Sequence, residues 1–76
     1  MNLPIKTTLK RHYWPDDPNW IIINESVPLG TEYKVLGFEK LTIINFELGR
    51  KRSSVPCYLV QRGNEDPGYI PTVCFE

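Results

Sequence analysis

The stretch PGYIPTVCFE, residues 67–76, carries the pattern that decides the fold. With the preceding GNED (63–66) it completes the segment GNEDPG, which is dense in the Gly, Asn, Asp and Pro residues that form turns. The residues that follow are mostly β-branched or aromatic, as in a strand. We therefore expect a tight turn over 63–68 and a closing strand, YIPTVCFE, over 69–76.

The same alternation of turn signals and strand-like segments runs through the rest of the chain. Seven prolines and five glycines leave no window long enough for a helix. The apolar parity switches between Ile43 and Ile44, which predicts a β-bulge. Strands are expected over 7–14, 20–24, 32–40, 41–48 and 55–62, separated by a turn at 15–19, a break at 25–31 and a basic turn at 49–54. Five or six short antiparallel strands of this kind are typical of a small all-β barrel or sandwich.

Residues predicted to lie inside come from the alternation and from strands that are apolar on both faces. They are Val35, Leu36, Phe38, Ile43, Leu59, Val60, Ile70 and Val73.

Length and charge limit the classes of function. Seventy-six residues predict a single small domain over 1–76. Nine basic and nine acidic residues leave no net charge, so no global field attracts nucleic acid or an anionic membrane. The N-terminal segment MNLPIKTTLKRHYW has no apolar signal region and no stretch is long enough to span a membrane, which predicts a cytoplasmic protein.

Cys57 and Cys74 are the only cysteines. In a cytoplasmic protein they are expected to be two reduced thiols that act as small core residues rather than a disulfide. With His12 they make three candidate soft ligands, but no zinc-type spacing is present, so we expect no metal and no cofactor. A Cys-His dyad stays open from sequence alone, although a barrel this small has little room for a deep pocket, and we expect no enzyme activity.

Residues 28–76 resemble the SH3 domain family. PLGTEYKVLG (28–37) is similar to the turn that feeds the second long strand, and CYLVQR (57–62) to the strand that begins with paired tryptophans. GYIP (68–71) matches the Gly-aromatic-Ile-Pro signature of the family. The resemblance implies an SH3-like barrel with a 3₁₀ turn before the last strand, and an insertion of about fifteen residues around LTIINFELGRKRSS.

The resemblance also implies a groove of aromatic residues that receives a polyproline II peptide. Tyr69 and Pro71 keep the residue types of the groove, but Cys57 replaces a tryptophan and Cys74 a tyrosine. The N-terminal Ala-Leu-Tyr-Asp-Tyr run of the family has no clear counterpart. We therefore expect a ligand other than a simple proline-rich peptide.

The leading hypothesis is a stand-alone module that binds a protein partner, as an adaptor or a small inhibitor of the size often encoded by prophages and mobile elements. Rigid rings and carboxylates in the loop HYWPDDPNW (12–20) suit apolar contact and cation binding, and the resemblance places this loop beside the GYIP turn. Either tryptophan can instead fold inward and leave the carboxylates solvated. The candidate partner-binding residues are Tyr13, Trp14, Asp16, Asp17, Trp20, Tyr58, Tyr69 and Pro71.

The alternative is a nucleic-acid-binding barrel. Arg50, Lys51 and Arg52 offer three cations at the predicted basic turn, next to hydroxyls that also contact phosphates. The same run can equally be a solvated hairpin tip that discourages edge aggregation. No aromatic residue within it can stack on a base, which favours the protein-binding hypothesis.

Overall fold

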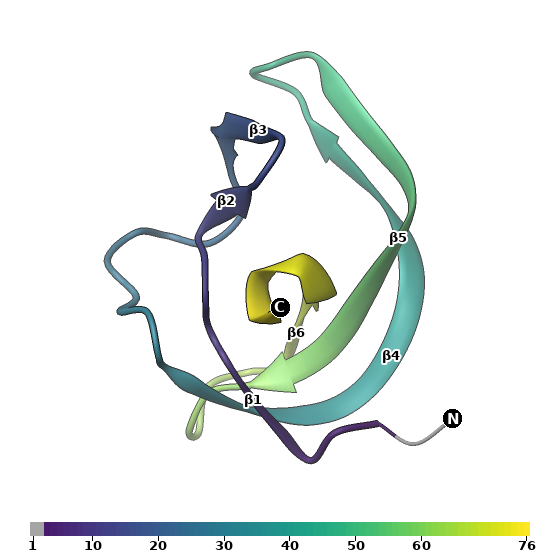
Figure 1. The fold of residues 1–76 in the computed structure, drawn as a ribbon. Coiled ribbons are helices and arrows are strands. Elements are labelled where there is room, and N and C mark those ends of the chain that lie inside the picture. Colours follow the sequence, from purple (N-terminus) through teal and green to yellow (C-terminus); the bar gives the residue numbers. More distant parts are fainter. Residues whose placement is uncertain (1–2) are drawn as a thin grey trace.

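The computed structural model describes residues 3–76, in which β-strands dominate (Figure 1). Met1 and Asn2, which belong to the predicted domain and to the N-terminal segment discussed above, lie outside the described residues. The predicted all-β class is confirmed. In chain order the elements are β1 (Lys6–Thr8), β2 (Tyr13–Trp14), β3 (Asp17–Ile21), β4 (Glu32–Asn45), β5 (Arg50–Gln61), β6 (Gly68–Pro71) and the 3₁₀ helix η1 (Thr72–Phe75).

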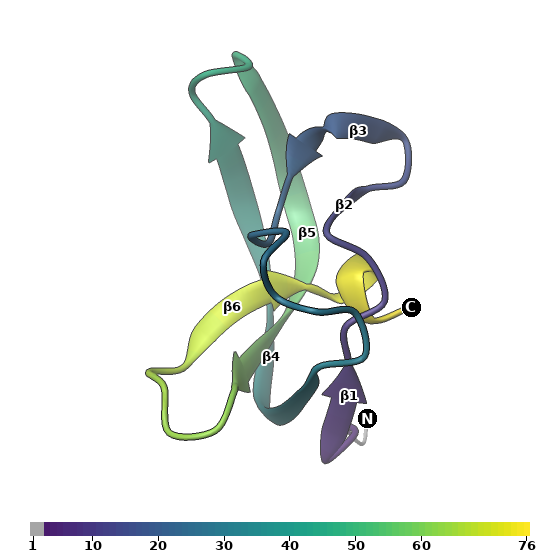
Figure 2. The ribbon, with the colours of Figure 1, turned by 90° about the vertical axis from the view of Figure 1, so that its left-hand side faces the viewer.

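The strands form two antiparallel sheets. One has the order β1-β4-β5-β6, and the other is the pair β2-β3. β4 and β5, of 14 and 12 residues, form a hairpin that curves around η1 (Figure 1) and extends beyond the other strands of its sheet, with β2-β3 beside its far end (Figure 2). Within residues 3–76 no strand pairing joins the two sheets, so the expected closed barrel of short strands is not observed.

Two irregularities bend the long hairpin. The register shifts between Val35 and Gly37 and again between Leu41 and Ile43. At the second shift Leu41 pairs with Val55 and Ile43 with Arg52, so β5 carries an extra residue, and Ser54 adopts a positive φ of 54°. A β-bulge increases the local twist of a hairpin in this way. The bulge predicted between Ile43 and Ile44 is not observed. The extra residue lies in the facing strand β5, and Leu41 and Ile43 keep the same inward side while Ile44 is 51% exposed.

The apolar core consists of two clusters on opposite faces of β5. Val60, with Tyr58 packed against it, belongs to a cluster around Leu9, Ile23, Tyr33, Cys74 and Phe75. Val55 and Cys57 belong to a second cluster with Trp14 and Trp20. Successive side chains of a strand point to opposite faces, which explains why residues 55 and 57 serve one cluster and residues 58 and 60 the other. β2 and β3 contribute the second cluster, and η1 contributes to the first.

Several predicted strands in the N-terminal half were wrong in extent. The segment 7–14 is divided into β1 and β2, and the predicted turn at 15–19 is partly strand, because β3 begins at Asp17. Pro18 is tolerated there because β3 is an edge strand that needs no donor on its outer side. The strand predicted over 20–24 ends at Ile21, since the N–H groups of Ile22 and Ile23 both donate to the carbonyl oxygen of His12, at 2.7 and 3.1 Å.

The tip of the long hairpin also differs from the prediction. Residues 32–45 form one strand, not two, and the turn lies at 46–49, where the Asn45 side chain accepts a hydrogen bond from the Leu48 N–H and Gly49 has a φ of 63°. Arg50, Lys51 and Arg52 therefore lie in β5 and not in a basic turn. The turn at 63–68 is confirmed up to the start of β6.

The end of the chain and two core assignments are corrected as well. YIPTVCFE is not a single strand, because β6 ends at Pro71 and η1 follows it, so no strand comes after the 3₁₀ turn among the described residues. Leu36 and Phe38, predicted to be buried, are 42% and 39% exposed. Leu36 is the extra residue of the first register shift, and Phe38 is covered only in part, by a T-shaped contact with the Tyr58 ring. Val60 is buried as predicted, and the other five predicted core residues are partly buried.

Candidate partner-binding groove

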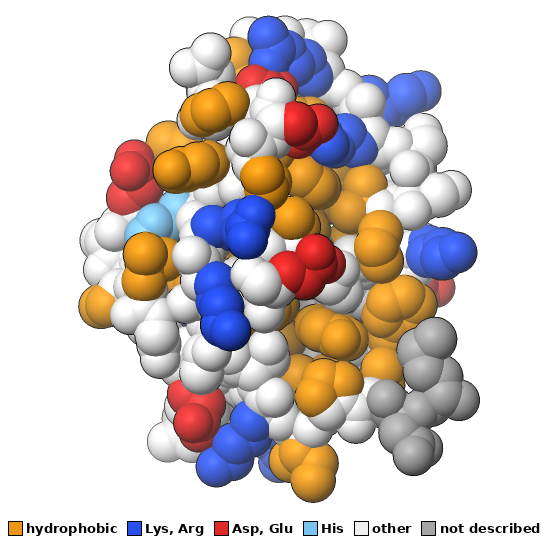
Figure 3. All heavy atoms as spheres, viewed as in Figure 1, with side chains coloured by type: hydrophobic (Ala, Val, Ile, Leu, Met, Phe, Trp, Pro, Cys, Tyr) orange, Lys and Arg blue, Asp and Glu red, His pale blue; other side chains and the backbone are white. Residues whose placement is uncertain are grey.

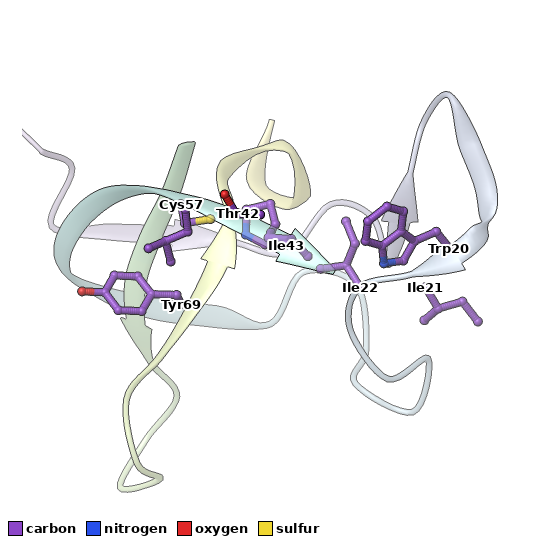
Figure 4. Close-up of a pocket in the computed structure, with 9 residues that line it drawn as sticks. Trp20, Ile21, Ile22, Thr42, Ile43, Cys57 and Tyr69 are labelled. Carbon is purple, nitrogen blue, oxygen red and sulfur yellow. The ribbon is translucent and has the colours of Figure 1, made fainter. Parts of the chain in front are cut away.

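An apolar groove of about 250 Å³ lies where β3, β4 and β6 approach one another. In the close-up, Trp20, Ile21 and Ile22 lie at one end and Tyr69 at the other, with Thr42 and Ile43 between them (Figure 4). Most of the side chains are hydrophobic, and the hydroxyls of Thr42 and Tyr69 are the polar exceptions. The lining residues are Trp20, Ile21, Ile22, Leu41, Thr42, Ile43, Cys57, Tyr69 and Pro71.

The floor of the groove follows from the register of the sheet. Cys57 of β5 pairs with Glu39 of β4 on one side and with Pro71 of β6 on the other. Residues directly opposite each other in a ladder point to the same face, so these three side chains form one row across the sheet. Cys57 is small and only 1% exposed, which keeps this part of the floor low.

The carboxylates of Asp16 and Asp17, where β2 turns into β3, are already paired with cations. Arg52 donates to Asp16, with Nη2 2.9 Å from Oδ1, and Arg50 pairs with Asp17. The hydrogen bond from Arg52 holds the pKa of Asp16 below its usual value. In the space-filling view basic and acidic side chains alternate at the end of the molecule that holds the hairpin tip (Figure 3). The predicted acidic loop and the predicted basic turn therefore neutralise each other.

The two tryptophans of the loop fold inward. Trp14 and Trp20 are 5% and 4% exposed and meet edge to face, with ring centroids 5.6 Å apart. The Arg52 guanidinium lies over both rings, at 4.1 Å from the Trp14 centroid and 5.6 Å from that of Trp20. Of the two orientations that the sequence left open, the structure has the buried one for both residues, although Trp20 still lines the groove.

The structure brings together only part of the predicted surface. Trp20, Tyr69 and Pro71 line one groove, as the expected approach of the loop to the GYIP turn requires. Tyr13 is 40% exposed on β2 outside the groove, and Tyr58 packs against Phe75 on the opposite face of β5.

The lining residues that sequence reasoning missed come mainly from two short apolar runs. These are Ile21 and Ile22 after Trp20, and Leu41, Thr42 and Ile43 in β4. The one signal in the sequence is the hydroxyl of Thr42 within the otherwise apolar run LTII (41–44), which indicates that this part of the strand is partly exposed. Cys57 was named only as the replacement of a groove tryptophan.

A carboxylate stands at the Tyr69 end of the groove. The Tyr69 hydroxyl donates to Glu39 Oε2 at 3.3 Å. Partial burial and the adjacent Glu39 charge raise the pKa of Tyr69 above its ordinary value. Among the described residues no salt bridge involves Glu39, in contrast to Asp16 and Asp17.

The thiols and the histidine occupy structural positions. Both cysteines are unpaired and buried, as small core residues. Burial raises the pKa of Cys57, and burial raises that of Cys74 to about 12, so both remain protonated thiols and weak nucleophiles. His12 Nε2 donates to the Val27 carbonyl oxygen at 2.6 Å. Residues 3–76 contain no group of three or more His, Cys, Asp or Glu side chains suited to a metal ion.

Comparison with protein-family models, with curated proteins and with solved structures found no match to this chain. Residues 3–76 also contain no helix with the length and apolar character that crossing a membrane requires. The assignment of a function therefore depends on the groove itself.

Proposed function

We propose that this protein is a protein-binding module with an SH3-like arrangement, whose groove holds an extended segment of a partner protein. The observation that carries the proposal is the groove itself, an apolar trough between strands with few polar groups. Such a surface suits the side chains of an extended chain. The protein then acts by occlusion or tethering, as an adaptor or a small inhibitor, and its unpaired thiols suit the reducing cytoplasm.

The size of the groove favours side chains over a small molecule. Its volume of about 250 Å³ is below the roughly 300–1,000 Å³ of typical small-molecule sites. It has room for one or two apolar side chains. The groove also lacks a nucleophile with a lowered pKa, since the Cys57 thiol on its floor is held protonated. Both features agree with binding and not with catalysis.

A comparison of two surface variants tests this function. Ile21 lines the groove and is 48% exposed, whereas Ile44 is 51% exposed and does not line it. I21K and I44K add the same charge at similar exposure, so both should fold. Partners captured by the wild-type protein from a lysate of the source cell, quantified by mass spectrometry, should be lost with I21K and kept with I44K. Equal capture by all three proteins would contradict the proposal.

Nucleic-acid binding through Arg50, Lys51 and Arg52 is the second candidate function. The ion pairs that two of these residues make with aspartates argue against it. Because Arg50 and Arg52 are paired with carboxylates, only Lys51 of the three lacks an acidic partner among the described residues. Three phosphate contacts give a log K against log salt slope of about −2.7 for duplex DNA. A slope near −3 with a random duplex would revive this candidate. We expect weak binding and a slope no steeper than about −1.

A further inference from the structure

The two ends of the groove differ in their available charge. At the Trp20 end, Asp16 and Asp17 are neutralised by arginines of β5. At the Tyr69 end, Glu39 is exposed, and the described residues supply it with one hydrogen bond, from Tyr69, and no cation. An ionised carboxylate has about four acceptor sites, so Glu39 keeps most of its capacity for a further donor.

Two independent observations direct Glu39 toward the groove. Its register partner is Cys57, a residue of the groove floor, and paired residues share a face of the sheet. Its hydrogen-bond partner is Tyr69, a residue of the groove wall. A ligand that covers Cys57 and Pro71 therefore passes directly beside the Glu39 carboxylate.

We propose that Glu39, held in place by Tyr69, binds a Lys or Arg side chain of the partner segment, next to an apolar side chain that fills the groove. This inference rests on the proposed function, because it assumes that the groove holds an extended chain. In an extended chain the side chains of residues i and i+2 lie on one face about 6.6 Å apart. The partner segment then carries an apolar residue and a cation two positions apart.

The charge of the site separates this ligand from others. A carboxylate beside an apolar floor repels phosphate and acidic peptides, while it forms a charge-assisted hydrogen bond with an ammonium or guanidinium group. The surrounding apolar side chains reduce the exposure of that pair to solvent. The contribution of Glu39 is to select the partner and set the direction of the bound chain more than to supply bulk affinity.

The probe for the experiment is a random 12-residue peptide library displayed on phage and panned on the full chain. Enriched peptides are synthesised, and their Kd values are measured by isothermal titration calorimetry with the wild type, E39Q, E47Q and I21K. E39Q keeps the acceptor for the Tyr69 hydroxyl and removes only the charge. E47Q is its matched control, because Glu47 is an exposed carboxylate in the hairpin turn outside the groove.

We expect the enriched peptides to share an apolar residue and a Lys or Arg two positions apart. E39Q should weaken their binding by about fivefold, the effect of a partly exposed charge pair, and E47Q should leave it unchanged. Replacing the peptide cation by Met should weaken wild-type binding by a similar factor and abolish the difference between wild type and E39Q, as a double-mutant cycle requires.

The outcomes separate this inference from the proposed function. Peptides that lose affinity for I21K but bind E39Q as tightly as the wild type would leave the groove function standing and overturn the role of Glu39. Enriched peptides without a cation would do the same. Peptides that bind I21K normally, self-association of the chain without any peptide, or no enrichment at all would overturn both.

Discussion

The guanidinium of Arg52 lies 4.1 Å from the centroid of the Trp14 ring and donates to the carboxylate of Asp16. One side chain of β5 thereby holds a ring of β2 and the carboxylate of the residue just before β3. Together with the Arg50–Asp17 pair, it fastens the small sheet to the long hairpin, and Trp20, held in the same cluster, forms one end of the groove. The shape of the groove therefore depends on contacts that lie outside it.

Replacing Arg52 by alanine is expected to lower the free energy of unfolding by about 1–2 kcal/mol. The variant loses the cation–π contacts with the two tryptophan rings, each worth about 0.5–1 kcal/mol at exposed sites. It also loses an exposed ion pair, which contributes little. Urea unfolding followed by tryptophan fluorescence measures the change. K51A is the control, because Lys51 is exposed and has no carboxylate partner among the described residues. Equal stability of the two variants would show that Arg52 does not fasten the loop.

The Asp16 carboxylate should make stability depend on pH in one direction. Because Arg52 lowers the pKa of Asp16 in the folded protein, the contribution of this pair is fully present above the unfolded pKa of about 3.9 and is lost as the pH falls through the lower folded value. The melting temperature of the wild type should therefore exceed that of D16N near neutral pH, and the difference should vanish in acid. E25Q is the control for removal of an exposed carboxylate. A difference that stays the same from neutral pH into acid would contradict the pairing.

Reversing the charge of both aspartates, in D16K with D17K, should destabilise the protein, because each carboxylate is paired with an arginine of β5. Two new lysines would face Arg50 and Arg52 across the loop. Like charges in place of two ion pairs should lower the melting temperature by several degrees, since about 1 kcal/mol corresponds to roughly 4–8 °C in a domain of this size. Differential scanning calorimetry at low salt measures the shift, and high salt should reduce it. An unchanged melting temperature would show that the two ion pairs do not contribute to stability.

Local patterns predict the all-β class and the turn at 63–68, because turn residues and strand alternation act over a few neighbours. Local patterns did not predict which charged residues pair with each other, because the paired residues are far apart in the sequence. Asp16 meets Arg52 only after the hairpin has folded back, and Asn45 with Gly49 moves the turn so that the arginines enter β5. The prediction that Phe38 is buried was wrong for a related reason. Apolar residues on both faces of a strand do not reveal whether other parts of the protein cover both faces.

Two leucine truncations should separate core from surface. Leu9 is 1% exposed and packs in the first cluster, whereas Leu36 is 42% exposed at the first register shift. L9A should cost about 2–5 kcal/mol of unfolding free energy, which is enough to unfold much of a marginally stable domain, and L36A less than about 1 kcal/mol. Chemical denaturation followed by circular dichroism measures both. Equal losses would contradict the observed core.

The Tyr69 hydroxyl gives a direct readout of Glu39. Partial burial, the larger cause, and the negative charge of Glu39 both raise the pKa of Tyr69, since each disfavours the phenolate. E39Q removes the charge and leaves the burial, so the pKa of Tyr69 should fall only part of the way toward its ordinary value near 10. Alkaline absorbance titration, with Y69F subtracted to isolate this residue, measures the shift, and E47Q should show none. An identical Tyr69 titration in the wild type and E39Q would mean that the carboxylate does not stand at this end of the groove, and it would remove the geometric basis for cation binding there.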